Sequence, residues 1–412
     1  MRKQLSFFDA VQAFAVLYLI VWSISPPLGI AMIYRLLALG LAAVWALIAF
    51  MRGFRLENMH IAAAVFIVGV AIVAFFDNWN FSDIIRQISI YMLFVEFLMF
   101  SFYYSKNKLD DLSILIPIIL LILIYFNYNT FKALLEDPTL SRIIVRNDES
   151  ANEYMLKGIG GYALVYAQVL FFPAGLFWTL NMFRRSKLKF IIGAAWLVTY
   201  VLLIMNAGYS IAVFSTVASV IVLFFYKRRS VVGVVVLTMI MFIGSMVLIL
   251  YVTPFREWLL TTFDGTAVAK KINDLVATSE SGEAEGSIQS RIEVYMITVR
   301  ALLRYPIIGL LWFPGVTGGH SGLFDVVALY GWVGGFIYGK VLFSVPNEFK
   351  NDNYNNNSLI SVINAQLVAM IFIAVLDSLP YQLMCSYLLI IPILLNDIKN
   401  MTGDSYESSV DG

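Results

Sequence analysis

The sequence has few of the residues on which metal sites, disulfides and charged surfaces depend. Its 412 residues include one cysteine and two histidines, and only 13% are charged. Cys385 alone cannot form an internal disulfide, and two distant histidines make a zinc site improbable, so no metal or other cofactor is expected. The formal net charge of +1 gives no basic surface for nucleic acid or another polyanion.

Nucleotide-binding motifs are also absent from the sequence. It contains neither a Walker loop nor a dinucleotide-binding fingerprint. This argues against a nucleotide as the direct energy source. An enzyme built from this chain would instead need an activated lipid donor.

Long hydrophobic runs dominate what the sequence does contain. Hydrophobic residues make up 60% of the chain and the mean hydropathy is +0.81, well outside the range of a soluble globular protein. Twelve runs approach spanning length, at about residues 9–25, 30–51, 60–76, 87–104, 111–127, 160–182, 188–206, 209–226, 231–252, 321–344, 358–376 and 380–396. The sequence therefore predicts an all-α polytopic membrane protein with about 12 transmembrane helices, forming one membrane domain over residues 1–412.

The basic residues predict how these helices are oriented. With both termini in the cytosol, the inner connections hold 16 of the 28 lysines and arginines, in agreement with the positive-inside rule. No small-residue cleavage site follows the first apolar run, so we expect that run to be a retained span. Two long outer loops then cover residues 127–159 and 253–320, and a site is most readily built there because the other connections are short.

One histidine lies at the end of the second outer loop. His320 follows Gly318 and Gly319 and directly precedes a predicted apolar helix. A neutral imidazole can accept a proton from an attacking hydroxyl, and the amides at a helix N-terminus favour an anion. The structural alternative is a histidine that only caps the helix. Two carboxylates could orient it: Asp325, about 140° around the helix, and Asp377, at an outer helix end.

Arginines in the second loop supply another element of a candidate site. A guanidinium can pair with diphosphate oxygens and stabilise charge on a departing phosphate. The segment from Ile288 to Leu303 is helix-like, and in a straight helix Arg291 lies about 180° from Arg300, whereas Arg300 and Arg304 share a face. All three cannot hold one diphosphate, so we expect at least one of them to be structural.

The first outer loop contains a further pair of arginines. Arg142 and Arg146 are four residues apart and could converge on the same site. Pairing with the nearby acidic residues Asp148, Glu149 or Glu153 is an equally good explanation for either arginine alone.

Several motifs in these loops are found together in a known family. The second loop contains Arg291 and Tyr295, then Arg304-Tyr-Pro-Ile-Ile-Gly309, then Gly319-His-Ser-Gly-Leu-Phe-Asp-Val-Val-Ala-Leu-Tyr-Gly331. The first contains Arg146-Asn-Asp-Glu-Ser-Ala-Asn-Glu-Tyr154, followed by Gly158-Ile-Gly-Gly-Tyr162. Together they resemble the signature of O-antigen and capsular polysaccharide polymerases (Wzy) and of the related O-antigen ligases.

The resemblance implies a metal-independent glycosyltransferase in the bacterial cytoplasmic (inner) membrane, with its active site facing outward. Its donor and acceptor would be undecaprenyl-diphosphate-linked oligosaccharides. His320 would activate the acceptor hydroxyl, and Arg291 with one or more of Arg142, Arg146 and Arg304 would hold the donor diphosphate. Tyr295, Gly319, Asp325 and Asp377 would support them. The expected partners are the lipid bilayer and a chain-length regulator, with no nucleic acid.

One departure from the family pattern bears on the choice of reaction. Many relatives, ligases above all, carry Ser-Arg where the eighth helix begins, whereas this chain reads Asn206-Ala-Gly-Tyr-Ser-Ile211 without an arginine. The polymerase interpretation is therefore favoured over ligase-type glycan transfer. A lipid-linked sugar flippase, with His320 in a gate, remains the alternative from a different class.

Overall fold

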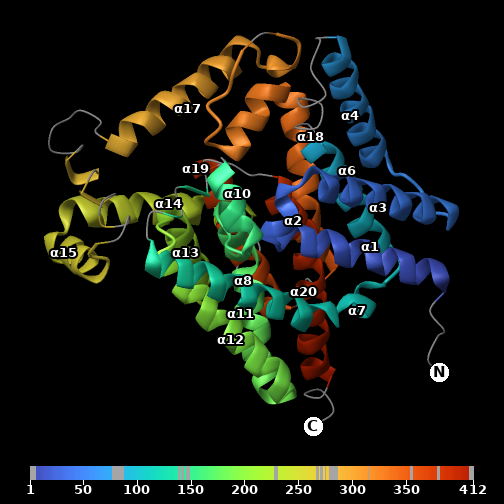
Figure 1. Cartoon of the computed structure of the whole chain (residues 1–412), viewed down its shortest axis with the longest axis horizontal. Coiled ribbons are helices and arrows are strands. Elements are labelled where there is room, and N and C mark those ends of the chain that lie inside the picture. The colour runs from blue at the N-terminus through green and yellow to red at the C-terminus, as the bar shows by residue number, and fades with distance from the viewer. Residues whose placement is uncertain are drawn as a thin grey trace. The chain divides into compact units, whose positions relative to one another are not determined.

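The computed structural model describes residues 6–76, 88–137, 140, 143–144, 149–226, 231–265, 269, 272–273, 275–277, 286–313, 315–352, 356–377 and 381–407. This part of the chain is almost entirely helical and includes no strand, which confirms the predicted all-α class (Figure 1). The chain forms two compact units. The first unit comprises residues 1–203, 337–359 and 380–412, and the second comprises residues 204–336 and 360–379.

Each of the predicted apolar runs corresponds to a helix. They are α1 (Phe7–Ile24), α3 (Met32–Met51), α4 (Asn58–Phe76), α6 (Ile88–Ser105), α8 (Leu115–Glu136), α11 (Tyr162–Arg185), α12 (Lys187–Asn206), α13 (Ser210–Phe225), α14 (Val231–Tyr251), α18 (Gly322–Asp352), α19 (Asn357–Leu376) and α20 (Tyr381–Glu407). Among the described residues, 7 helices are long and apolar enough to cross a membrane, or up to 8 with one bent pair. The chain is a polytopic membrane protein, while twelve spans and cytosolic termini stay predictions.

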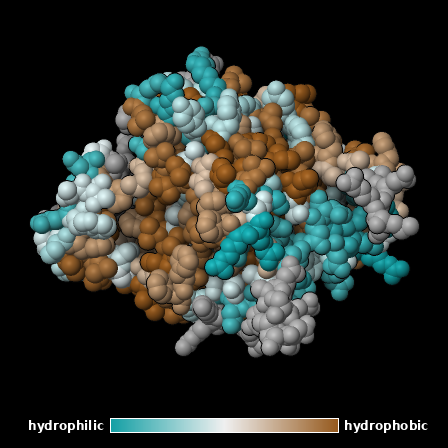
Figure 2. Space-filling model, turned by 90° about the horizontal axis from the view of Figure 1, so that it is seen from below, coloured by the Kyte–Doolittle hydropathy of each residue, from teal (hydrophilic) through white to brown (hydrophobic). Residues whose placement is uncertain are grey.

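The surface of the protein carries the apolar character expected next to lipid. Large hydrophobic side chains are exposed on several of the apolar helices, among them Leu47 on α3, Val65 on α4 and Ile191 on α12. Figure 2 shows extended hydrophobic areas on one face, beside a hydrophilic region. Apolar patches of this extent on a folded chain mark contact with a membrane or another apolar partner.

α20 is the central helix of the first unit. It packs against α1, α6 and α11. Near its C-terminal end, the Trp178 indole on α11 donates a hydrogen bond of 2.7 Å to the Asp397 carboxylate. Asn396 and Asn400 both donate to Asp110 on the short helix α7 (Leu109–Leu112). Apolar packing along α20 is therefore combined with a polar attachment at one end.

The first outer loop begins later than the sequence predicts, because α8 continues to Glu136. The polar residues Asn127 and Thr130, in the C-terminal half of α8, are both buried inside the first unit. The Asn127 amide donates to Gln168 on α11 at 2.8 Å, and the Thr130 hydroxyl accepts the Gly160 N–H at 2.8 Å. Only the helix α10 (Glu149–Leu156) is described at length within the loop.

The second predicted loop contains more regular structure than a connection would need. It includes α15 (Thr253–Thr262), α17 (Gly286–Arg304) and the 3-10 turn η1 (Gly309–Trp312). α17 confirms the helix predicted for residues 288–303. α15 follows α14 directly, at an angle of 95°. The loop is therefore structured at its beginning and near its end.

Two glycines of the second unit allow two segments to cross in direct backbone contact. α18 is interrupted at Gly331, which has φ 66° and ψ −174°. The Trp332 N–H beyond the break donates to the Pro306 carbonyl at 2.9 Å. A Cβ on Gly309, which has φ 67°, would collide with the backbone of Leu329 and Gly331. Only glycine fits both the backbone conformation and the space at this crossing.

The crossing predicts that Gly309→Ala is strongly destabilising. A non-glycine residue at this φ costs about 1–3 kcal/mol, and backbone atoms cannot move aside as a flexible side chain could. Gly339→Ala on α18 is the control, because no atom lies within 4 Å of its Cβ position. Size-exclusion chromatography of detergent-solubilised protein after heating should show a lower melting temperature for Gly309→Ala only. Equal melting temperatures for the two variants would contradict the crossing.

Candidate active site

The loop before α18 is attached to α17 by a shared threonine hydroxyl. The Gly318 N–H donates to Thr298 Oγ1 at 2.9 Å, and that hydroxyl donates to Asp325 Oδ1 at 2.6 Å. Thr298 and Asp325 are 2% and 8% exposed, so the bond between them lies away from water, while the bond to Gly318 is partly buried. A Cβ on Gly318 would collide with the Val294 carbonyl oxygen. The loop backbone therefore lies directly on α17, which requires glycine at this position.

The N-terminus of α18 is capped by Ser321. Its hydroxyl oxygen accepts the Phe324 N–H at 3.3 Å, and the Asp325 Oδ2 atom accepts the Ser321 N–H at 2.9 Å. This reciprocal pair resembles a capping box, with the acidic residue one position later than usual. The Ser321 hydroxyl also donates to the Ala374 carbonyl on α19 at 3.2 Å. The capping role that His320 could have had belongs to its neighbour.

The C-terminal end of α19 connects the other parts of the site. The Tyr295 hydroxyl on α17 donates to the Leu376 carbonyl at 3.0 Å. The Asp377 carbonyl accepts the Gly322 N–H of α18 at 2.8 Å. Burial and, after it, the negative charge of Asp377 raise the pKa of Tyr209, which lies in the turn before α13. α17, α18, α19 and this turn therefore meet around the residues 318–322.

His320 projects from this anchored loop with its side chain exposed. It lies between Gly319, whose φ is +74°, and the capping residue Ser321. His60 is different: it is 3% exposed, its Nδ1 accepts the Glu57 N–H at 3.0 Å, and its Nε2 lies 3.2 Å from the Ser101 hydroxyl. Of the two histidines, His60 is held inside the first unit and His320 is accessible to a substrate.

Of the two carboxylates proposed to orient His320, that of Asp325 holds the loop. Both oxygens of Asp325 are engaged, one by the Thr298 hydroxyl and the other by the Ser321 N–H. Asp377 accepts a hydrogen bond from α18 through its backbone carbonyl, and its negative charge contributes to the raised pKa of Tyr209. Asp325 therefore positions His320 through the neighbouring backbone, and Gly319 supplies the left-handed turn that precedes the histidine.

Helix register separates the arginines of α17. Arg291 is four residues before Tyr295 and seven before Thr298, which places the three positions within about 60° on one helix face. That face contacts Leu376 and Gly318. Arg300 lies about 180° from Arg291 and is exposed. Of these two positions, Arg291 is the one on the face that holds the loop.

Arg304 has a structural contact of its own. It is the exposed last residue of α17, and its guanidinium carbon lies 5.4 Å from the centre of the Tyr305 ring. That ring stacks on Phe313 with centroids 4.0 Å apart. Diphosphate binding by Arg304 stays a prediction. Arg142 and Arg146 lie outside the described residues.

Thr298 and Ser321 were not recognised from the sequence. Ser321 and Asp325, at the start of an apolar run, form a near-capping pattern that could have been detected. Thr298 gives no such signal, because a threonine in a helix is common and only its tertiary contacts distinguish it.

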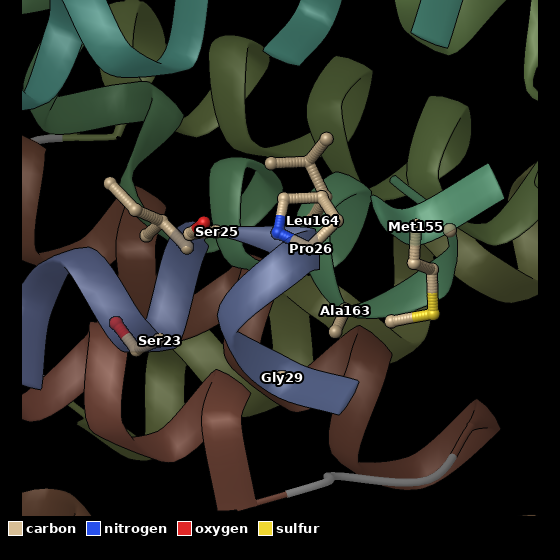
Figure 3. A pocket seen from close by; sticks show the side chains of 9 residues that line it. Ser23, Ser25, Pro26, Gly29, Met155, Ala163 and Leu164 are labelled. Atoms are coloured by element: carbon tan, nitrogen blue, oxygen red, sulfur yellow. The ribbon is translucent and has the colours of Figure 1, made fainter. Parts of the chain in front are cut away.

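A cavity elsewhere is too small to hold a sugar. It lies in the first unit, where α1, α2 (Pro26–Ile30), α10 and α11 meet, and Ser25, Gly29, Met155 and Leu164 line it (Figure 3). Its volume of about 30 Å³ offers room for a few water molecules. This cavity is separate from the exposed surface around His320, which belongs to the second unit.

No protein-family model matches the chain, and no curated protein matches its sequence. Within the described segments, no group of three or more histidine, cysteine, aspartate or glutamate side chains is arranged to hold a metal ion. The class that the fold defines is a polytopic helical membrane protein.

The shared hydroxyl predicts that Thr298→Val loosens the loop that carries His320. Valine keeps the shape but removes both hydrogen bonds, and each contributes about 1 kcal/mol. Hydrogen–deuterium exchange of peptides covering residues 315–322 should then accelerate by roughly 30-fold. Thr298→Ser, which keeps the hydroxyl, is the control and should exchange like the native chain. Unchanged protection in Thr298→Val would show that the hydroxyl does not hold the loop.

Proposed function

We propose that this protein is a polysaccharide polymerase, a glycosyltransferase that joins undecaprenyl-diphosphate-linked oligosaccharide repeat units. The observation that carries the proposal is an exposed histidine on a loop fixed to α17 at Thr298. Helix register assigns position 291 to the same face of α17 as Thr298. A base and a cation on opposite sides of a substrate are what glycosyl transfer from a diphosphate requires. The resemblance of the surrounding motifs to Wzy polymerases gives the substrate class.

In the proposed reaction, the acceptor hydroxyl oxygen attacks the anomeric carbon of the donor sugar. His320 takes the hydroxyl proton as the new carbon–oxygen bond forms. The bond between the anomeric carbon and the diphosphate oxygen breaks, and undecaprenyl diphosphate leaves with the electron pair. Arg291 stabilises the negative charge on the departing diphosphate, and the imidazolium returns its proton to solvent or to the leaving group. The step needs neither a metal ion nor a nucleotide.

The surrounding residues fix where this chemistry occurs. Thr298, Ser321 and Asp325 hold the loop through two buried hydrogen bonds and one partly buried hydrogen bond, so the backbone on both sides of His320 is fixed. Tyr295 attaches α17 to the end of α19. A general base must remain within hydrogen-bond distance of its proton, which rigid attachment of the loop favours.

The proposal includes a location and an orientation. With twelve spans and both termini in the cytosol, the second loop faces outward from the bacterial cytoplasmic membrane. Lipid-linked repeat units would then meet His320 at the outer leaflet. A chain-length regulator is the protein partner that such a polymerase would use.

The polymerase proposal predicts the products of His320→Ala in the native host. Removing a general base slows its reaction by about 10²–10⁴-fold, so long polysaccharide should disappear while single lipid-linked repeat units accumulate. His60→Gln, matched for protein amount, should keep normal chain lengths because His60 is structural. Gel electrophoresis of the polysaccharide and mass spectrometry of the lipid-linked pool give the readout.

Other outcomes of this experiment support other functions. Normal chain lengths in His320→Ala would overturn the role of this residue. Loss of all outward-facing repeat units would favour a flippase. Long lipid-linked polysaccharide that is no longer transferred to its final acceptor would favour a ligase.

The register of α17 predicts different effects at two of its arginines. Arg291→Gln should lower kcat/KM for the lipid-linked donor by about 100-fold, the usual effect of removing one group that stabilises developing negative charge. Arg300→Gln, an identical change on the opposite face of the same helix, should leave it unchanged. An assay in membranes with a purified lipid-linked repeat unit measures both. Equal losses in the two variants would contradict the assignment.

A further inference from the structure

α14 is long enough to cross a bilayer by itself. Its 21 residues rise about 30 Å, the thickness of the hydrocarbon region. The helix ends at Tyr251, because Pro254 lacks an N–H for the Leu250 carbonyl and can only occupy the first turn of a new helix. α15 then continues at 95° to α14. If α14 runs near the membrane normal, α15 lies close to the membrane plane.

An exposed apolar stripe runs along α14 to this bend. It comprises Val236, Ile240, Ile243, Val247 and Tyr251, which are 48%, 60%, 61%, 47% and 75% exposed. Their spacing of three and four residues places them on one helix face, as expected for a surface covered by lipid. The stripe ends in a tyrosine, a residue type enriched at the boundary between lipid and water.

α15 has two distinct sides. On the inner side, Phe255 and Leu259 pack in a cluster with Ile249 and Ile272. At the edge of this inner side, Trp258 is 58% exposed, with its ring centroid 5.9 Å from that of Phe255. Glu257 is exposed as well, but lies about 100° around the helix from Trp258. The exposed surface is therefore divided into an aromatic part and a charged part.

The two other arrangements of this segment fit the residues less well. A re-entrant α15 would carry Arg256 and Glu257 into the hydrocarbon region, where charged side chains are costly. A fully aqueous α15 would leave Trp258 and Tyr251 in water, next to a stripe that faces lipid. A helix lying at the interface, with its aromatic part toward the lipid and its charged part toward water, satisfies both groups.

We propose that α15 lies in the head-group region of the bilayer, with Tyr251 and Trp258 contacting lipid and Glu257 facing water. The second outer loop therefore begins on the membrane surface. The proposed position of α15 does not depend on the proposed enzymatic activity, because a helix on the membrane surface is compatible with any function of the chain.

Site-specific fluorescence quenching tests the proposal on the full chain. In a Cys385→Ser background, Trp258→Cys, Tyr251→Cys and Glu257→Cys are each labelled with an environment-sensitive fluorophore. The proteins are reconstituted in phosphatidylcholine–phosphatidylglycerol vesicles with the outer loops facing the bulk solution. Lipid-attached nitroxide near the head group should quench the labels at positions 258 and 251 more than that at 257. Aqueous iodide should show the reverse order.

Two results would overturn the interfacial placement. Equal quenching of all three labels by iodide, without lipid quenching, would show that α15 is surrounded by water. Protection of the label at 258 from both quenchers would show that another protein surface covers it. The three positions are exposed, so each variant should elute as a single species like the native chain, and the label at 251 tests the same surface independently of α15.

Discussion

The candidate site depends on one hydroxyl group. Thr298 accepts a hydrogen bond from the loop backbone at Gly318 and donates one to Asp325, which in turn holds the amide of Ser321. Because Thr298 and Asp325 are buried, neither can exchange its partner for water without cost. α17, the loop and the start of α18 are joined through this chain of bonds. The position of His320 relative to α17 follows from it.

This arrangement explains how a histidine can be exposed and still be well placed. An imidazole oriented by a carboxylate is fixed through its own ring, because one ring nitrogen donates a hydrogen bond to the carboxylate. That nitrogen is then not available to a substrate. Here the backbone on both sides of His320 is fixed instead, by Thr298 before it and by Ser321 and Asp325 after it. Both ring nitrogens then stay available to a substrate, which suits a group that must accept a proton and release it again.

Much of the fold follows from hydrophobic patterning, while the contacts that build the site do not. Each predicted apolar run is a helix, because a helix satisfies its own backbone hydrogen bonds while its apolar side chains are buried or face an apolar surrounding. Hydrophobic patterning placed the start of the first outer loop too early, at residue 127. Asn127 is polar, but it lies inside the first unit, where it pairs with Gln168. His320 could be singled out from its residue type, and the helix that carries Arg291 could be predicted from the helical period of its sequence. The roles of Thr298 and Gly309 could not, since they arise from partners 20 or more residues away.

The crossing of Gly309 and Gly331 has a topological consequence. Together with the bonds of Thr298, it closes the chain between α17 and the middle of α18 into a loop fastened at two separate places. Fastening a segment at both ends removes conformational freedom much as a covalent cross-link does. Proteins that face an oxidising exterior often use disulfides for this purpose. This chain, with its single cysteine, obtains the same restriction from two glycines and a threonine, so reducing conditions should leave the loop intact.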